Sequence, residues 1–133
     1  MSAMLELRDV EARYGQVQAL RGITLQVPEG AIVAVLGANG AGKTTTLRAV
    51  SGTVRRSGTI TFDGKPLRGG PEAVARAGIA CRPEEWEGYL ILADVLVAAG
   101  RKPEAVRVTE QAVKMAHPNE PRPKQALEAL KKP

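Results

Sequence analysis

At 133 residues, the chain is long enough for one domain with a hydrophobic core. Apolar residues make up 44% and charged residues 25%, which is ordinary for a globular protein. Aromatic residues make up only 3%, too few for the stacking surfaces that bind single-stranded nucleic acid. The net charge of +5 is spread along the chain, so a solvated surface explains it better than a nucleic-acid interface, which stays a weak alternative.

The cysteine count and the hydropathy pattern indicate in which cellular compartment the chain is expected. Cys81 is the only cysteine, which rules out an internal disulfide and fits a reducing compartment. The first ten residues alternate charged with apolar side chains and lack the apolar core of a signal peptide. No stretch approaches the roughly 18 apolar residues that span a bilayer. We therefore expect a soluble protein whose membrane role, where it has one, comes through a partner.

The first part of the chain, residues 4–83, alternates short β-type runs with Gly-rich turns. The period of two predicts strands over residues 5–10 and 23–27, with a turn at Tyr14 and Gly15. Residues 31–36 (AIVAVL) are continuously apolar, which is typical of a parallel strand buried on both faces. A helix is expected over residues 43–50, with Leu47 and Val50 facing inward.

A further strand and a short helix complete this part. Residues 59–62 are expected to form a strand that closes in a turn at Asp63 and Gly64. Pro71 is expected to open a short helix through Arg76, which Gly78 breaks.

From about residue 84 the pattern changes to helical spacing. Tyr89, Leu92, Ala93 and Leu96 fall on one face of a helix that Gly100 ends. A second helix follows from Pro103, and residues 117–123 then form a Pro-rich break before a short helix over residues 125–132. The sequence therefore predicts a helical hairpin and a tail.

Residues 37–44 (GANGAGKT) carry the strongest chemical signal, since they match G-x-x-x-x-G-K-[ST] between an expected strand and an expected helix. The glycines allow the backbone to approach phosphate oxygens, and successive N–H groups point into one concavity. The helix adds its positive N-terminal end. The Lys43 ammonium reaches the β- and γ-phosphates, and the Thr44 hydroxyl is suited to ligate Mg²⁺. The pattern predicts a site for a nucleoside triphosphate, with ATP and Mg²⁺ as cofactors.

Residues 4–83 also resemble the N-terminal part of an ABC transporter ATP-binding subunit, most of all the branched-chain amino-acid importer type. The resemblance is carried by residues 5–10 (LELRDV), 13–15 (RYG), 19–20 (AL), 36–45 (LGANGAGKTT), 57–58 (SG), 62–64 (FDG) and 76–80 (RAGIA). It implies that Tyr14 stacks on adenine and that Thr45 assists phosphate binding; packing at a strand end is the alternative for Tyr14. The expected cofactor-binding residues are Tyr14, Gly37, Ala38, Asn39, Gly40, Ala41, Gly42, Lys43, Thr44 and Thr45, and Thr44 is the expected metal ligand.

The later motifs that the family uses for hydrolysis do not appear in this sequence. There is no Leu-Ser-Gly-Gly signature, no apolar strand that ends in Asp-Glu and no switch histidine in a matching context. Asp94 follows an apolar run, but helical spacing makes it a solvated helix residue. His117 is expected at a helix end. We assign no catalytic residue, and whether the chain is an enzyme stays open.

Residues 86–119 resemble one tetratricopeptide-type repeat. The similarity lies in residues 92–93 (LA), Leu96, residues 99–101 (AGR), residues 104–105 (EA), Ala112 and Pro118. Such a unit is a helix hairpin, and it needs neighbours to cover its apolar face. Thr109 departs from the pattern, because a large aromatic residue is expected there.

These observations predict an α/β fold: a truncated ABC-type P-loop NTPase region with a β-rich start, followed by an α-helical hairpin. The expected domains are a partial ATP-binding domain at residues 1–83, a tetratricopeptide-like hairpin at 84–119 and a tail at 120–133. The resemblance implies ATP binding in a transporter, a complete ABC ATPase subunit or a membrane permease as partner, and a cytoplasmic location, peripheral at the inner membrane. The alternative is a non-catalytic interaction module, or the product of a gene rearrangement, that binds a protein through the hairpin.

Overall fold

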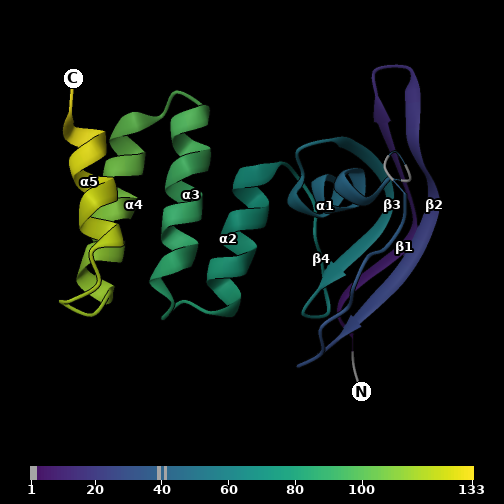
Figure 1. The fold of residues 1–133 in the computed structure, drawn as a ribbon, viewed down its shortest axis with the longest axis horizontal. Helices are drawn as coiled ribbons and strands as arrows, with labels where there is room; N and C mark the ends of the chain where they lie inside the picture. Colours follow the sequence, from purple (N-terminus) through teal and green to yellow (C-terminus); the bar gives the residue numbers. More distant parts are fainter. Residues whose placement is uncertain (1–2, 39, 41) are drawn as a thin grey trace. The chain divides into compact units, whose positions relative to one another are not determined.

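The computed structural model describes residues 3–38, 40 and 42–133. They form two compact units, Met1–Val74 and Ala75–Pro133. The first unit contains a sheet and one helix, and the second is helical (Figure 1). This combination of a sheet with helices confirms the α/β class that the sequence predicts.

The sheet of the first unit has four strands in the order β2-β1-β3-β4. Strands β1 (Ala3–Tyr14) and β2 (Val17–Pro28) form a long antiparallel hairpin, and β3 (Arg55–Phe62) pairs antiparallel with the other side of β1. The short strand β4 (Lys65–Pro66) pairs with β3. The strands expected at residues 5–10, 23–27 and 59–62 are confirmed, and the turn after Tyr14 is tight because Gly15 adopts a φ of 60°.

A bulge shapes the middle of the sheet where β1 and β3 meet. The pairing register shifts between Arg8 and Glu11, and Asp9 has a φ of 49°. Gly58 on β3 lies so close that a Cβ atom there would be 2.4 Å from the Asp9 carbonyl oxygen. Only glycine fits this contact, and the bulge bends β1 over the core.

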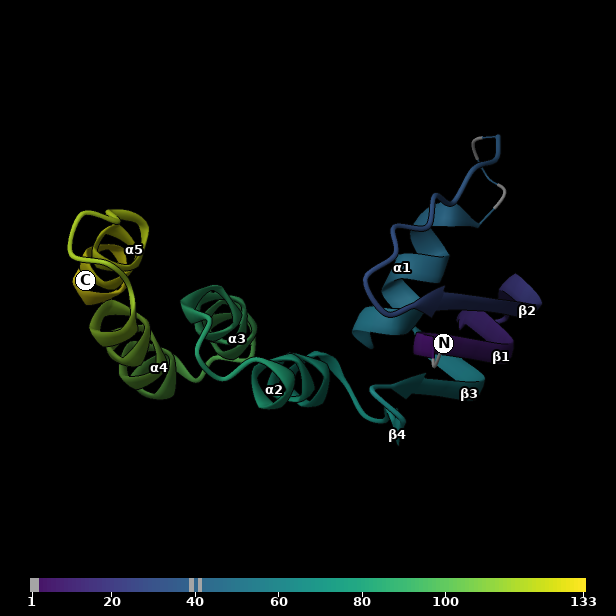
Figure 2. The ribbon, with the colours of Figure 1, turned by 90° about the horizontal axis from the view of Figure 1, so that it is seen from below.

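Helix α1 (Lys43–Ser51) lies across one face of the sheet (Figure 2). It turns Thr45, Thr46 and Ala49 inward, towards a core that includes Leu7, Val10 and Leu20. The helix agrees with the sequence prediction, but Leu47 is 65% exposed and was wrongly expected to face inward. The buried stripe is instead the threonine-rich side of the helix.

The buried parallel strand expected at residues 31–36 is wrong. Residues 31–38 are irregular, and Ile32 and Leu36 are 99% and 89% exposed. A strand of that kind needs paired neighbours on both edges and cover on both faces. Among the described residues every strand pairing is antiparallel and belongs to β1–β4, so this apolar run has no ladder to join.

The helical unit is built from consecutive helices. Helix α2 (Pro71–Cys81) crosses the boundary between the two units, and α3 (Trp86–Ala98), α4 (Lys102–Met115) and α5 (Arg122–Lys131) follow it. Gly78 was expected to end α2, but the helix continues through it. A single glycine costs a helix only about 1 kcal/mol, which neighbouring turns offset.

Helices α3 and α4 form the expected hairpin and share a core. Leu92, Ala93, Leu96 and Ala105 are buried together, and partly buried side chains from α2, α4 and α5 pack on them. Thr109 is fully buried and donates its hydroxyl proton to the Ala105 carbonyl oxygen at 2.7 Å. Ala105 and Ala112 of α4 are also fully buried. Within the described residues, no helix combines the length and the apolar character needed to cross a bilayer.

Candidate functional site

The Gly-rich loop at residues 37–44 leads directly into α1. Gly40 and Gly42 have φ angles of 88° and 95°, conformations that side-chain-bearing residues rarely adopt. Gly42 is the N-cap of α1 and has no room for a side chain, because a Cβ atom there would lie 2.8 Å from Leu20 Cδ2. Asn39 and Ala41, two of the expected site residues, lie outside the described residues.

The N-terminus of α1 has the features of an anion-binding helix end. Its cap makes no side-chain hydrogen bond, and its first turn contains no acidic residue. The Gly42 carbonyl oxygen accepts hydrogen bonds from the Thr46 backbone N–H and from the Thr46 hydroxyl, both at 2.8 Å. The first N–H groups of a helix have no partner within it, and the aligned peptide dipoles make that end positive.

The loop and the sheet together enclose a hollow of about 400 Å³. One wall comes from the loop and the first turn of α1, and the other from the start of β2. The lining residues are Val17, Gln18, Ala19, Gly40, Gly42, Lys43, Thr44 and Thr45. The Lys43 ammonium donates a hydrogen bond back to the Gly37 carbonyl oxygen. This bond holds the cation across the loop, beside the helix N-terminus.

Tyr14 lies at the end of β1 and is joined to α1 by its hydroxyl group. The hydroxyl is 3.3 Å from Thr45 Oγ1 and accepts a hydrogen bond of 3.1 Å from Arg48. The Arg48 guanidinium also lies 5.9 Å from the centre of the Tyr14 ring. The hydrogen bond with Thr45, followed by the one with Arg48, lowers the pKa of the Tyr14 hydroxyl below its ordinary value. The ring is still 42% exposed.

The structure brings most of the expected site residues into one neighbourhood. Gly40, Gly42, Lys43, Thr44 and Thr45 line the hollow, and Thr45 contacts Tyr14 directly. Gly37 is linked to the hollow through its bond with Lys43, whereas Ala38 is an exposed loop residue outside the lining.

Sequence reasoning missed the β2 side of the site. Val17 and Gln18 line the hollow, and Arg48 holds Tyr14 from one turn further along α1. The spacing of Thr45 and Arg48 on α1 could have indicated that both reach the same neighbour, because residues three apart lie on one face of a helix.

The two residues that sequence analysis set aside lie where it expected them. Asp94 is an exposed residue of α3, and His117 lies just beyond the end of α4. The His117 ring nitrogen Nδ1 accepts a hydrogen bond of 3.2 Å from the Asn119 backbone. Both residues belong to the second unit.

A glycine-rich loop that opens a helix beside a sheet is the arrangement of P-loop proteins. The sequence profile of the ABC transporter family matches residues 20–129, so the chain belongs to that family. The matched region includes the helices as well as the loop. The tetratricopeptide resemblance of residues 84–119 therefore stays a prediction.

Several ATP-binding proteins resemble a half or more of the chain. It is 44% identical over 68 residues to the xylose/arabinose import ATP-binding protein XylG of Sulfolobus acidocaldarius, covering 50% of this chain and 27% of that protein. It is 41% identical over 83 residues to the high-affinity branched-chain amino acid transport ATP-binding protein BraG of Pseudomonas aeruginosa, covering 61% of this chain and 36% of that protein. It is 42% identical over 81 residues to the Nod factor export ATP-binding protein I of Cupriavidus pinatubonensis, covering 59% and 25%. The chain thus spans about a quarter to a third of the length of these relatives.

Proposed function

We propose that the chain binds ATP through the loop at residues 37–44, as the nucleotide-binding part of an ABC transporter subunit. The observation that carries the proposal is the hollow of about 400 Å³ between this loop and the start of β2. It brings the uncapped N-terminus of α1 and the Lys43 ammonium to one place. Family membership and the names of the three relatives, each an ATP-binding protein, support the choice of nucleotide.

The residues present fit a polyphosphate. Gly42 lines the hollow, and its lack of a side chain lets the start of α1 lie against Leu20, since a Cβ atom there would lie 2.8 Å from Leu20 Cδ2. Backbone N–H groups and the Lys43 ammonium would hold phosphate oxygens, and the Thr44 hydroxyl would ligate Mg²⁺. The bound metal would neutralise phosphate charge. In the structure the Gly37 carbonyl oxygen accepts the Lys43 hydrogen bond, and phosphate oxygens would replace it as the partner.

We further propose that Tyr14 is the surface on which adenine stacks. Its hydroxyl is fixed by Thr45 and Arg48, so the ring is held in one orientation while remaining 42% exposed. A ring held in this way loses little entropy on binding a base. Stacking on such a ring contributes about 1–3 kcal/mol.

Protection against unfolding tests nucleotide binding. A ligand that binds only the folded state raises the unfolding temperature as its concentration increases. ATP with Mg²⁺ should stabilise the first unit in the parent and in Lys65→Ala, a matched loss of one exposed lysine on β4. At the same ATP concentration it should stabilise Lys43→Ala less than the other two proteins. Equal protection of all three proteins would contradict the proposal.

Membership of the ABC transporter family also supports a proposal for the partner and the location. We propose that the chain acts with a membrane permease, or pairs with a complete ABC ATPase subunit that supplies the hydrolytic motifs in trans, and that it lies on the cytoplasmic side of the inner membrane. The test is co-purification of a membrane permease with the tagged chain from detergent-solubilised membranes. Recovery of the chain alone from the soluble fraction would count against both the partner and the location.

For the transported substrate we propose branched-chain amino acids. The support is the 41% identity to BraG, which covers a larger share of that relative than the XylG and Nod factor matches cover of theirs. The related proteins also include sugar and sulfate importers, so the test must compare substrates. The test measures uptake of labelled leucine and of labelled ribose by cells that depend on this chain, with Lys43→Ala as the inactive control. Uptake of leucine would support the proposal, and uptake of ribose alone would contradict it.

A further inference from the structure

Residues 31–36, which we call the apolar run, lie exposed between the end of β2 and the loop that opens α1 (Figure 2). Ile32 is 99% and Leu36 89% exposed, and Val33 and Val35 are each 42% exposed. A monomeric protein rarely leaves several large apolar side chains together in water. None of these four side chains belongs to the buried core of the first unit, so the apolar run has the character of an interaction surface.

The backbone of the apolar run is also available for pairing. Residues 32–36 neither donate nor accept a backbone hydrogen bond with another described residue. Before them, the Ala31 N–H donates to the Pro28 carbonyl oxygen at 3.1 Å, and after them the Gly37 carbonyl oxygen accepts from Lys43. A continuous row of such groups offers the donors and acceptors by which one strand adds to another.

The two outer strands of the sheet are less suited to such an addition. β4 is two residues long and ends in Pro66, which has no N–H to donate. β2 carries the charged Arg21, and its pairing with β1 is irregular at Gly22, which has a φ of 79°. Short length, proline, charge and irregular pairing are the features that prevent strand association. The apolar run is six residues long and contains neither proline nor charge.

The distribution of charge favours a second copy of the chain as the partner. The chain has a net charge of +5, so most approaches between two copies bring like charges together. Residues 30–42 contain no charged side chain and form the longest such stretch of the sequence. Two copies can therefore meet along this stretch without repulsion, whereas a charged partner would find no complementary group there.

The composition of the apolar run suits pairing with an identical segment. Ile32, Val33 and Val35 are β-branched, and such residues favour strands. Short segments with high β-propensity, no net charge and no proline are the ones that pair with copies of themselves. The features that make the run a poor loop therefore make it a good strand once a partner strand is present.

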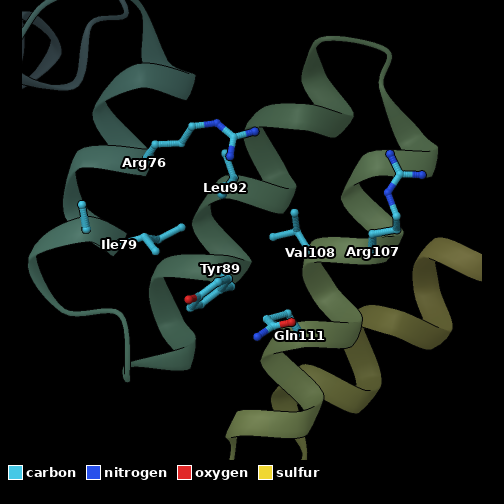
Figure 3. Close-up of a pocket in the computed structure, with 8 residues that line it drawn as sticks. Arg76, Ile79, Tyr89, Leu92, Arg107, Val108 and Gln111 are labelled. Carbon is cyan, nitrogen blue, oxygen red and sulfur yellow. The ribbon is translucent and has the colours of Figure 1, made fainter.

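The helical unit offers another apolar surface, which is less suited to contact between two copies. A hollow lined by Ile79, Leu92 and Val108 lies among α2, α3 and α4 (Figure 3). Arg76 and Arg107 line the same hollow from opposite sides. Two copies that met over this hollow would have to bury these charged side chains, which costs free energy.

We propose that the apolar run forms a β-strand by pairing with the apolar run of a second copy, antiparallel and about a two-fold axis. Antiparallel pairing of one segment with itself gives both copies the same contacts, which is the usual symmetry of protein dimers. A contact of this length is small beside the roughly 1,200–2,000 Å² of stable interfaces, so the dimer should form at about 100 µM and dissociate at about 1 µM. The pairing requires no nucleotide and goes beyond the proposed ATP site.

Sedimentation of the full chain without nucleotide tests the proposal. The parent should sediment at about 100 µM with twice the chain mass of 14.1 kDa, and as a monomer at about 1 µM. Ile32→Lys places like charges in the pair and should weaken dimerisation by about tenfold or more. It leaves the folded monomer intact, because the Ile32 side chain is 99% exposed. Gln16→Lys adds the same charge at an exposed position in the turn between β1 and β2 and should associate as the parent does.

Amide hydrogen exchange of the parent locates the contact without relying on any variant. Only every second residue of an antiparallel strand donates to a given neighbour, so alternate amides within residues 32–36 should gain protection at high concentration and lose it on dilution. Equal association of Ile32→Lys and the parent, protection that does not alternate, or assembly beyond the dimer would each overturn the proposal. A monomer at every concentration would overturn it in favour of a different protein as the partner of this run.

Discussion

Replacing Gly42 by alanine adds two separate costs to the first unit. The φ of 95° at this position is unfavourable for any residue with a Cβ atom, at about 1–2 kcal/mol. The new Cβ atom would also lie 2.8 Å from Leu20 Cδ2, and Leu20 is only 3% exposed. Crowding a buried side chain in this way costs about 1–3 kcal/mol more. We expect Gly42→Ala to lower the free energy of unfolding by roughly 2–5 kcal/mol.

Gly40→Ala is the matched control for this loss. Gly40 has a φ of 88°, but nothing lies within 4 Å of a Cβ atom added there, so only the backbone cost of about 1–2 kcal/mol applies. The single tryptophan lies in the helical unit, so amide hydrogen exchange of the buried β1 residues Leu7 and Val10 is the suitable assay. A loss in Gly42→Ala no larger than in Gly40→Ala would refute the contact with Leu20 as the cause.

Three further outcomes are expected. Leu96→Ala should lower the stability of the helical unit by about 2–5 kcal/mol, because Leu96 is fully buried; denaturation followed by Trp86 fluorescence measures it, and a loss below about 1 kcal/mol would contradict the packing. The hydrogen bonds of Arg101 are the chief cause that lowers the pKa of Glu104. The pair therefore stabilises the folded state at pH values above the ordinary pKa of glutamate, and this stabilisation is lost as the pH falls through the lowered pKa. Arg101→Gln should therefore melt below the parent at neutral pH and approach it in acid, and a constant difference across that range would be evidence against the pair. The chain alone should release phosphate from ATP no faster than a blank, because the sequence carries neither a second Mg²⁺-holding aspartate nor a catalytic glutamate in context; turnover that Lys43→Ala abolishes would show that this expectation is wrong.

Patterns in the sequence correctly predicted the elements that depend on residues close together in the chain. The hairpin turn after Tyr14 and the spacing of Leu92 and Leu96 each depend on residues close together in the chain. The strand expected at residues 31–36 failed because a buried parallel strand depends on distant partners. Gly78 was expected to break a helix that the neighbouring turns of α2 sustain.

The residues of the candidate site also fall into those that a local motif predicts and those that depend on distant parts of the chain. The glycines, Lys43 and Thr44 could be named from a contiguous motif, because their spacing fixes a loop and a helix start. The wall formed by Val17 and Gln18 could not, since it depends on how β2 lies beside the loop. The link from Arg48 to Tyr14 likewise joins residues 34 positions apart.

Calorimetric titration with ATP and Mg²⁺ tests the central claim most directly. The parent chain and Lys65→Ala should bind with one-to-one stoichiometry and equal affinity, because Lys65 lies outside the lining of the loop hollow. Lys43→Ala should bind more weakly than the parent by about tenfold or more, since a charge-assisted hydrogen bond contributes about 1.5–3 kcal/mol. Equal affinity of Lys43→Ala and the parent, or no binding by the parent, would contradict the assignment of residues 37–44 as a nucleotide site.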